Sequence, residues 1–196
     1  RHIVALRGDP PEQGGRFEAH PDGYTGAADL VAGLVKRHPF EISVSAYPEV
    51  HPDARDAESD LDNLKRKIEA GADAAFTQLF YINENFLRFR DRCRASGIDV
   101  PLVPGIMPIT EFSRIQRIAS LCGVEFPSGL AQRLEAAKDD RDVQLAVGVE
   151  YAVEQCRELI AEGVPGIHFY ALNRSQACTR ILEQLGRGPF SEATGE

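Results

Sequence analysis

A short proline-rich loop brings three reactive side chains close together in this sequence. Tyr47, Glu49 and His51 occupy alternate positions, and Pro48 and Pro52 follow the first and the last of them. Each proline fixes its own φ and disfavours helical backbone in the residue before it, so the loop is expected to be extended and stiff. Stiff polar loops after strands often carry the sites of α/β proteins. A proline-rich surface turn is the alternative interpretation.

The segment after this loop carries a polar stripe on a predicted helix. Asp60, Asn63 and Lys67 are spaced i, i+3 and i+7, which places them on one helix face beside the apolar positions. One interpretation is a solvated face with ion pairs between neighbours. The other is a polar wall for an elongated ligand, in which Arg66 and Lys67, near His51, supply the positive charge that a diphosphate requires.

Two further polar residues lie in predicted strands. Gln78 ends an apolar run, and a buried amide there needs a partner, which could be a ligand or a neighbouring backbone group. His168 alternates with Ile167 and Phe169 and is interpreted as a core histidine rather than a metal ligand. No His, Asp or Glu residues in the sequence have metal-ligand spacing, and no nucleophile motif predicts acyl transfer.

Apolar periodicity and turn residues predict the elements that must position these side chains. Strands are predicted at residues 3–6, 41–46, 74–80, 100–106 and 166–170. Helices are predicted at residues 27–37, 60–70, 83–95, 110–122, around Gln132, at 142–161 and at 176–185. We expect Asn83 and Thr110 to cap their helices and the first strand to be buried on both faces. This alternation indicates parallel βα units.

The ends of the predicted strands distinguish two parallel architectures. In an open doubly wound sheet, functional polar residues follow mainly the strands at the switch point. In a barrel, the carboxyl ends of all strands meet at one mouth, so every strand can be followed by such residues. Here all five strands end in polar or turn sequences. We therefore favour an α/β fold of the (β/α)8 TIM-barrel type, of which this chain supplies about the last five βα units.

Composition and charge limit the class of protein. The chain has 196 residues, 43% of them hydrophobic and 27% charged, as expected for one globular domain. A net charge of −8 argues against a nucleic-acid partner, and no apolar run approaches the ~20 residues of a membrane span. The cysteines show no Cys-x-x-Cys spacing and are interpreted as free thiols of a cytoplasmic protein: Cys93, Cys122, Cys156 and Cys178.

Six segments of the sequence resemble one known family in the same order. They are residues 5–9, 46–52, 64–72, 77–78, 104–108 and 168–174, and the resemblance extends from about Ile3 to Leu185. Together they closely resemble methylenetetrahydrofolate reductase. The resemblance implies a (β/α)8 barrel that binds FAD at its mouth, takes a hydride from NADH or NADPH and reduces methylenetetrahydrofolate to the 5-methyl form. Residues 1–196 would be a single domain, the C-terminal portion of that flavin-binding barrel, in a protein that we expect to be a homo-oligomer.

The resemblance also implies roles for individual residues. Those that would contact FAD are Arg7, Gly8, Asp9, Ala27, Tyr47, His51, Ala54, Asp60, Asn63, Arg66 and Lys67. Asp9 would also meet the pterin and tune the flavin, and Gln78 would serve both the folate and the nicotinamide, so these two are the predicted catalytic residues. Arg114 and Arg174 would lie in the folate region.

The sequence departs from the family in three respects. Arg114 stands where part of the family has a glutamine, and Ile118 where it has a phenylalanine, so folate packing is expected to differ. The family's general acid is a glutamate on the first barrel strand, and residues 1–196 contain no match to it. The chain begins at Arg1 and passes directly into a strand-like run, so we expect it to start partway through a domain and to be inactive alone.

A non-catalytic flavin- or folate-binding protein, a regulatory relative and another barrel enzyme of pterin or flavin chemistry stay open as alternatives.

Overall fold

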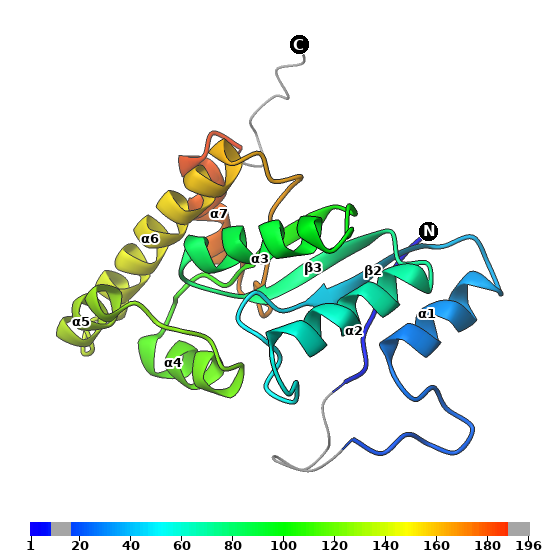
Figure 1. Ribbon diagram of the computed structural model, residues 1–196. Coiled ribbons are helices and arrows are strands. Elements are labelled where there is room, and N and C mark those ends of the chain that lie inside the picture. Colours follow the sequence, from blue (N-terminus) through cyan, green and yellow to red (C-terminus); the bar gives the residue numbers. More distant parts are fainter. Residues whose placement is uncertain (9–16, 188–196) are drawn as a thin grey trace.

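The computed structural model describes residues 1–8 and 17–187, and their strands form one parallel sheet. The strands are β1 (His2–Ala5), β2 (Glu41–Ala46), β3 (Ala74–Leu79), β4 (Leu102–Ile106) and β5 (His168–Phe169). The helices are α1 (Ala27–Val35), α2 (Ala57–Glu69), α3 (Asn83–Ala95), α4 (Phe112–Leu121), α5 (Ser128–Ala136), α6 (Arg141–Ala161) and α7 (Ser175–Gln184). The predicted alternation of strands and helices is thereby confirmed (Figure 1).

The five strands lie side by side in chain order, β1-β2-β3-β4-β5, and each pairs in parallel with the next. A doubly wound sheet would reverse its strand order at a switch point, and these strands show no reversal. The sheet is therefore a half-barrel, as a partial TIM barrel requires. Figure 1 shows α2 and α3 lying across β2 and β3, with α1 toward one edge and α6 and α7 toward the other.

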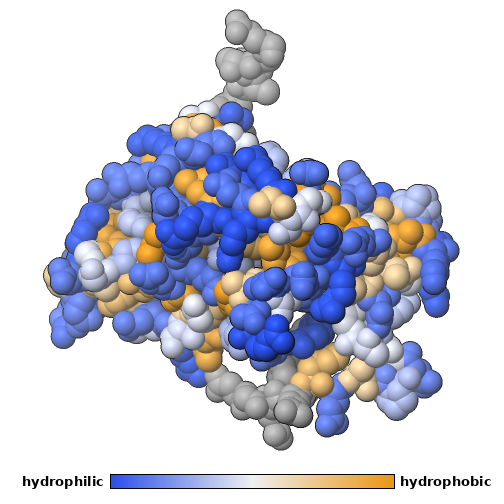
Figure 2. Space-filling model, in the orientation of Figure 1, coloured by the Kyte–Doolittle hydropathy of each residue, from blue (hydrophilic) through white to orange (hydrophobic). Residues whose placement is uncertain are grey.

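The two faces of the sheet differ because side chains alternate along each strand. Ala5, Val44, Ala75 and Leu102 share one face through their register and belong to the main core, which α1, α2, α3, α6 and α7 complete. The helices are polar on the side away from this core, and Figure 2 shows a mostly hydrophilic surface. Across residues 1–8 and 17–187, no helix is long and apolar enough to cross a bilayer.

The opposite, concave face carries a row of rings. Phe76 stacks on His168 with 5.0 Å between ring centroids, and His168 meets the ring of Tyr170 edge-on at 4.8 Å. His168 was interpreted as a core histidine, but it is only half-buried on this face, and burial lowers its pKa. Ile3 to Leu6 were expected to be buried on both faces, which is wrong: Val4 is 47% and Leu6 56% exposed. Val4 points to the concave face, and β1 is an edge strand.

Two predicted helix caps are also wrong, because residues of α6 cap α4 and bind the Asn83 side chain. Thr110 does not cap α4; instead the Gln144 side-chain oxygen accepts a hydrogen bond of 2.7 Å from the backbone N–H of Phe112. Asn83 is the first residue of α3 rather than its cap, and its amide donates to Gln155 O at 3.1 Å. By contrast, Asp56 forms a reciprocal capping box with Ser59, which starts α2 three residues before the predicted position.

Candidate functional site

A cavity of about 670 Å³ opens at the carboxyl ends of the first three strands, and we call it the main cavity. This volume lies within the ~300–1,000 Å³ typical of ligand pockets. Ten of the residues predicted to bind a cofactor line it: Arg7, Gly8, Ala27, Tyr47, His51, Ala54, Asp60, Asn63, Arg66 and Lys67. They come from the segment after β1, the start of α1, the loop after β2 and α2. Asp9 lies outside the described residues.

The loop after β2 forms part of this wall and is held by two hydrogen bonds of His51. The His51 backbone N–H donates to the Asp60 carboxylate at 2.9 Å, and the His51 ring Nδ1 accepts from the Asp53 N–H at 2.9 Å. The rings of Tyr47 and His51 meet edge-on with centroids 4.5 Å apart. The loop is therefore built into the cavity wall, contrary to its alternative interpretation as a surface turn.

The polar stripe of α2 faces the main cavity rather than solvent. Asp60 is 8% and Lys67 only 3% exposed, which rules out a solvated face at these two positions. The Lys67 ammonium donates to the Ser45 carbonyl oxygen at 2.6 Å. Burial lowers the pKa of Lys67 to about 8, and the nearby Asp60 carboxylate partly opposes this shift. Lys67 is thus a buried cation whose charge depends on pH near neutrality.

Arg7 adds a further cation to the cavity wall. Its guanidinium donates to the Asp53 carboxylate at 2.9 Å and lies 5.0 Å from the centroid of the Phe17 ring. The hydrogen bond from Arg7 is the largest cause of the lowered pKa of Asp53. With Arg55, Arg66 and Lys67, the cavity wall carries four basic side chains in a chain of net charge −8.

Gln78 and Tyr170 line the side of the cavity nearest the sheet. The Gln78 side-chain oxygen accepts from the Leu79 N–H at 2.9 Å, so a backbone group provides the partner predicted for this amide oxygen. The Tyr170 hydroxyl donates to the Thr77 carbonyl oxygen at 2.8 Å, where β3 is irregular. A side chain at Gly105 would collide with both Thr77 and the Tyr170 ring. Tyr170 was not among the predicted site residues, although its position at the end of a predicted strand could have indicated that it belongs to the site.

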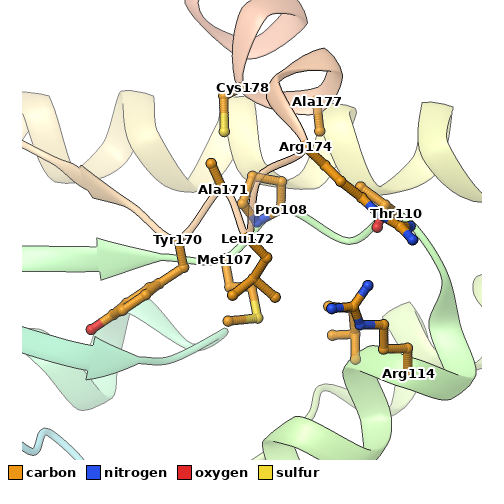
Figure 3. A pocket seen from close by; sticks show the side chains of 11 residues that line it. Met107, Pro108, Thr110, Arg114, Tyr170, Ala171, Leu172, Arg174, Ala177 and Cys178 are labelled. Atoms are coloured by element: carbon orange, nitrogen blue, oxygen red, sulfur yellow. The ribbon is translucent and has the colours of Figure 1, made fainter.

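A second, narrower pocket brings Arg114 and Arg174 together (Figure 3). Figure 3 shows both guanidinium groups reaching toward the same space, with Met107 and Leu172 beside them. Tyr170 lines both this pocket and the main cavity, so the two are neighbours. Neither arginine pairs with a carboxylate in the described part of the chain, which leaves two positive charges available to an anionic group.

Known proteins resemble this chain over almost its whole length. The profile of the family described as methylenetetrahydrofolate reductase matches residues 1–186. The 5,10-methylenetetrahydrofolate reductase of Pectobacterium carotovorum subsp. carotovorum is 47% identical over 189 residues, which cover 96% of this chain and 61% of that protein. The enzyme of the same name from Escherichia coli (strain K12) is 46% identical, with 96% and 62% covered.

A solved structure shares the fold at lower sequence similarity. It is an uncharacterized protein from Clostridium thermocellum that binds two copies of 5-methyl-5,6,7,8-tetrahydrofolic acid. The TM-score is 0.52 at 16% identity, over 80% of this chain and 56% of that one, so the likeness concerns the fold alone. This chain spans about three fifths of the length of its bacterial relatives. From the profile match over residues 1–186 and these identities, the chain belongs to the methylenetetrahydrofolate reductase family.

Proposed function

We propose that this chain provides the flavin- and folate-binding part of an enzyme that reduces 5,10-methylenetetrahydrofolate to 5-methyltetrahydrofolate. The electrons would come from NADH or NADPH and pass through FAD. The observation that carries this proposal is the main cavity. Ten residues matched to the family's FAD contacts come from four separate segments, and the fold brings all ten into its wall. We further propose that the half-barrel belongs to a complete (β/α)8 barrel, in a homo-oligomeric cytoplasmic protein.

The residues of the main cavity fit FAD chemically. An ammonium has three N–H donors, and the described contacts of Lys67 use one of them, on Ser45. Buried donors without partners favour a ligand that accepts hydrogen bonds, and a diphosphate does so with full negative charge. Arg66 and Arg7 would add charge, while Asp60 and Asn63 offer polar atoms to sugar or ribityl hydroxyls. Bound FAD would supply the hydride chemistry, which no side chain can perform.

The chain's own residues would then bind and orient the two reactants. Gln78 lies between the main cavity and the sheet, where it would position the folate or the nicotinamide against the cofactor. Arg114 and Arg174, which share the second pocket, would hold the anionic end of the folate. Asp9 is proposed to meet the pterin. Residues 1–196 contain no match to the family's acidic glutamate, so this chain by itself is expected to bind the cofactor without turnover.

The test is a flavin titration followed by two half-reactions. The purified full-length protein is titrated with FAD, reduced anaerobically with NADH or NADPH, and then mixed with methylenetetrahydrofolate. The proposal expects a bound yellow flavin that is bleached by the nicotinamide and recovers its colour with the folate. A protein that binds no FAD would refute the cofactor assignment. Bound flavin that no folate reoxidises would instead support a non-catalytic binding protein.

A further inference from the structure

Glu49 belongs to the loop that walls the main cavity, but its side chain lies on the other side of that loop. Tyr47 and His51 line the main cavity, whereas Glu49 and Val50 line a separate groove of about 650 Å³. This rear groove is completed by residues of α3, among them Asn85, and by the segment between α4 and α5. Successive residues of one short loop therefore face two different spaces.

The Glu49 carboxyl joins three segments that are distant in sequence. One oxygen accepts a hydrogen bond from the side-chain amide of Asn85, in the first turn of α3. The same oxygen accepts from the backbone N–H of Glu125 at 3.3 Å, in the connection between α4 and α5. The side-chain oxygen of Asn85 in turn accepts a hydrogen bond from the guanidinium of Arg88, which fixes the orientation of the side-chain amide. A single carboxyl thus ties the cavity loop to two helical segments.

The other Glu49 oxygen is buried and has no hydrogen-bond partner among the described residues. Burial raises the pKa of Glu49, although the hydrogen bonds from Asn85 and Glu125 oppose the shift, while the Glu125 carboxylate adds to it. A half-satisfied buried carboxyl costs stability compared with an apolar side chain that fills the same space. Such a group therefore calls for an explanation other than stability.

The backbone next to Glu49 is strained. Val50 has φ of 72°, in the left-handed region that a β-branched residue rarely adopts. This conformation reverses the chain between Glu49 and His51, which is why their side chains point to opposite sides. The strained turn is held on one side by the His51 N–H, which donates to Asp60, and on the other by the Glu49 carboxyl.

We propose that Glu49 is a positioning residue of the cofactor site. Its carboxyl holds Val50 in the left-handed conformation and so keeps Tyr47 and His51 against the main cavity. The tie itself does not depend on the ligand, whereas its effect on cofactor affinity rests on the proposed function. Because the connection that carries Glu125 follows α4, the same carboxyl also links the cavity loop to the helix that bears Arg114.

The test compares Glu49→Ala with Glu49→Gln in the full-length protein. Hydrogen exchange is measured without cofactor at the amides of residues 50, 51, 53 and 54, with α6 amides as reference, and the Kd of FAD is measured separately. In Glu49→Ala we expect loop exchange about tenfold faster and FAD binding about tenfold weaker. Glu49→Gln keeps an acceptor oxygen for Asn85 and Glu125, so both values should return to within about threefold of wild type.

Two further variants make the result decisive. Glu125→Ala keeps the backbone donor and should leave exchange and FAD affinity unchanged. Asn85→Ala removes the tie to α3 but keeps the bond from the Glu125 N–H, so it should give part of the Glu49→Ala effect, and the double variant should be no worse than Glu49→Ala alone. Unchanged loop exchange in both Glu49→Ala and Asn85→Ala would overturn the proposal. If the wild type binds no FAD, the proposed function fails, and the exchange data still decide whether Glu49 holds the loop.

Discussion

At the scale of a single residue, Lys67 shows how burial makes the charge of a side chain depend on pH. Its ammonium lies beneath the main cavity, bound to the Ser45 carbonyl oxygen, and burial brings its pKa down to about 8. A base with a lowered pKa is charged below that value and neutral above it. An anionic ligand prefers the charged form, so ligand binding near pH 8 should take up a proton.

Lys67→Met should weaken FAD binding at pH 7 by roughly 1.5–3 kcal/mol, because it removes a charge-assisted contact but keeps a long side chain. Above pH 8 the wild-type Kd should rise by up to about tenfold per pH unit and approach that of the variant. Fluorescence titrations of FAD between pH 7 and 9 measure both effects. Arg66→Met is the control, since arginine stays charged and its penalty should not change with pH. A flat wild-type profile would contradict the role of Lys67.

Gln78→Leu should separate binding from turnover. The substitution removes the acceptor of the Leu79 N–H, so we expect the free energy of unfolding to fall by about 1 kcal/mol. Because leucine is close to glutamine in size, we expect the affinity for FAD to stay unchanged. Reoxidation of reduced flavin by methylenetetrahydrofolate should slow by at least about tenfold, as expected when a positioning contact is lost. Stopped-flow absorbance gives the rate. Normal reoxidation would make Gln78 a purely structural residue.

At the scale of elements, the structure shows why helix positions were predictable and their ends were not. The apolar and polar stripes of α2 follow from spacing within one helix, and Asp60, Asn63 and Lys67 indeed share one wall. The start of α4 depends instead on Gln144, which lies 32 residues from Phe112 in the sequence. A cap supplied by another helix leaves no local signal, so Thr110 was predicted in its place.

Gln144→Ala should destabilise the protein by about 2–3 kcal/mol, because its buried amide serves two separate chain segments. Its oxygen caps Phe112, and its nitrogen donates to the carbonyl oxygens of Ala137 and Lys138. Urea denaturation monitored by circular dichroism measures the change. Gln116→Ala, at an exposed position of α4, should shift the midpoint little. Equal effects of the two substitutions would show that the interhelical cap contributes nothing.

At the scale of the whole molecule, the strand order and the gathering of the strand ends could be predicted because both follow from parallel βα units. Contacts between distant segments could not be predicted. The hydrogen bonds between Tyr170 and Thr77 and between Glu49 and Asn85 join residues that are 93 and 36 positions apart. The exposure of Val4 was also missed, since a continuous apolar run looks alike whether one or both faces of its strand are covered.

The open sheet leads to a prediction about residues 1–196 expressed alone. β1 and β5 each have one side without a partner strand in the described structure, and Val4 and Leu6 are exposed at the β1 edge. Unpaired edges with exposed apolar side chains recruit other strands, so we expect concentration-dependent association in light scattering. Lysine or glutamate at Val4 should reduce this association, because a charge on an edge strand opposes further pairing.

The same chain should bind FAD but should not reduce methylenetetrahydrofolate at an appreciable rate. Ten predicted FAD contacts are present in one cavity, whereas the family's general acid has no match here. Loss of such an acid typically costs ~10²–10⁴-fold in rate, and an unclosed barrel would position the folate poorly as well. Flavin reoxidation is assayed side by side with the Escherichia coli relative, which supplies the reference rate. Soluble monomers with rates near that reference would show that neither the acid nor barrel closure is needed.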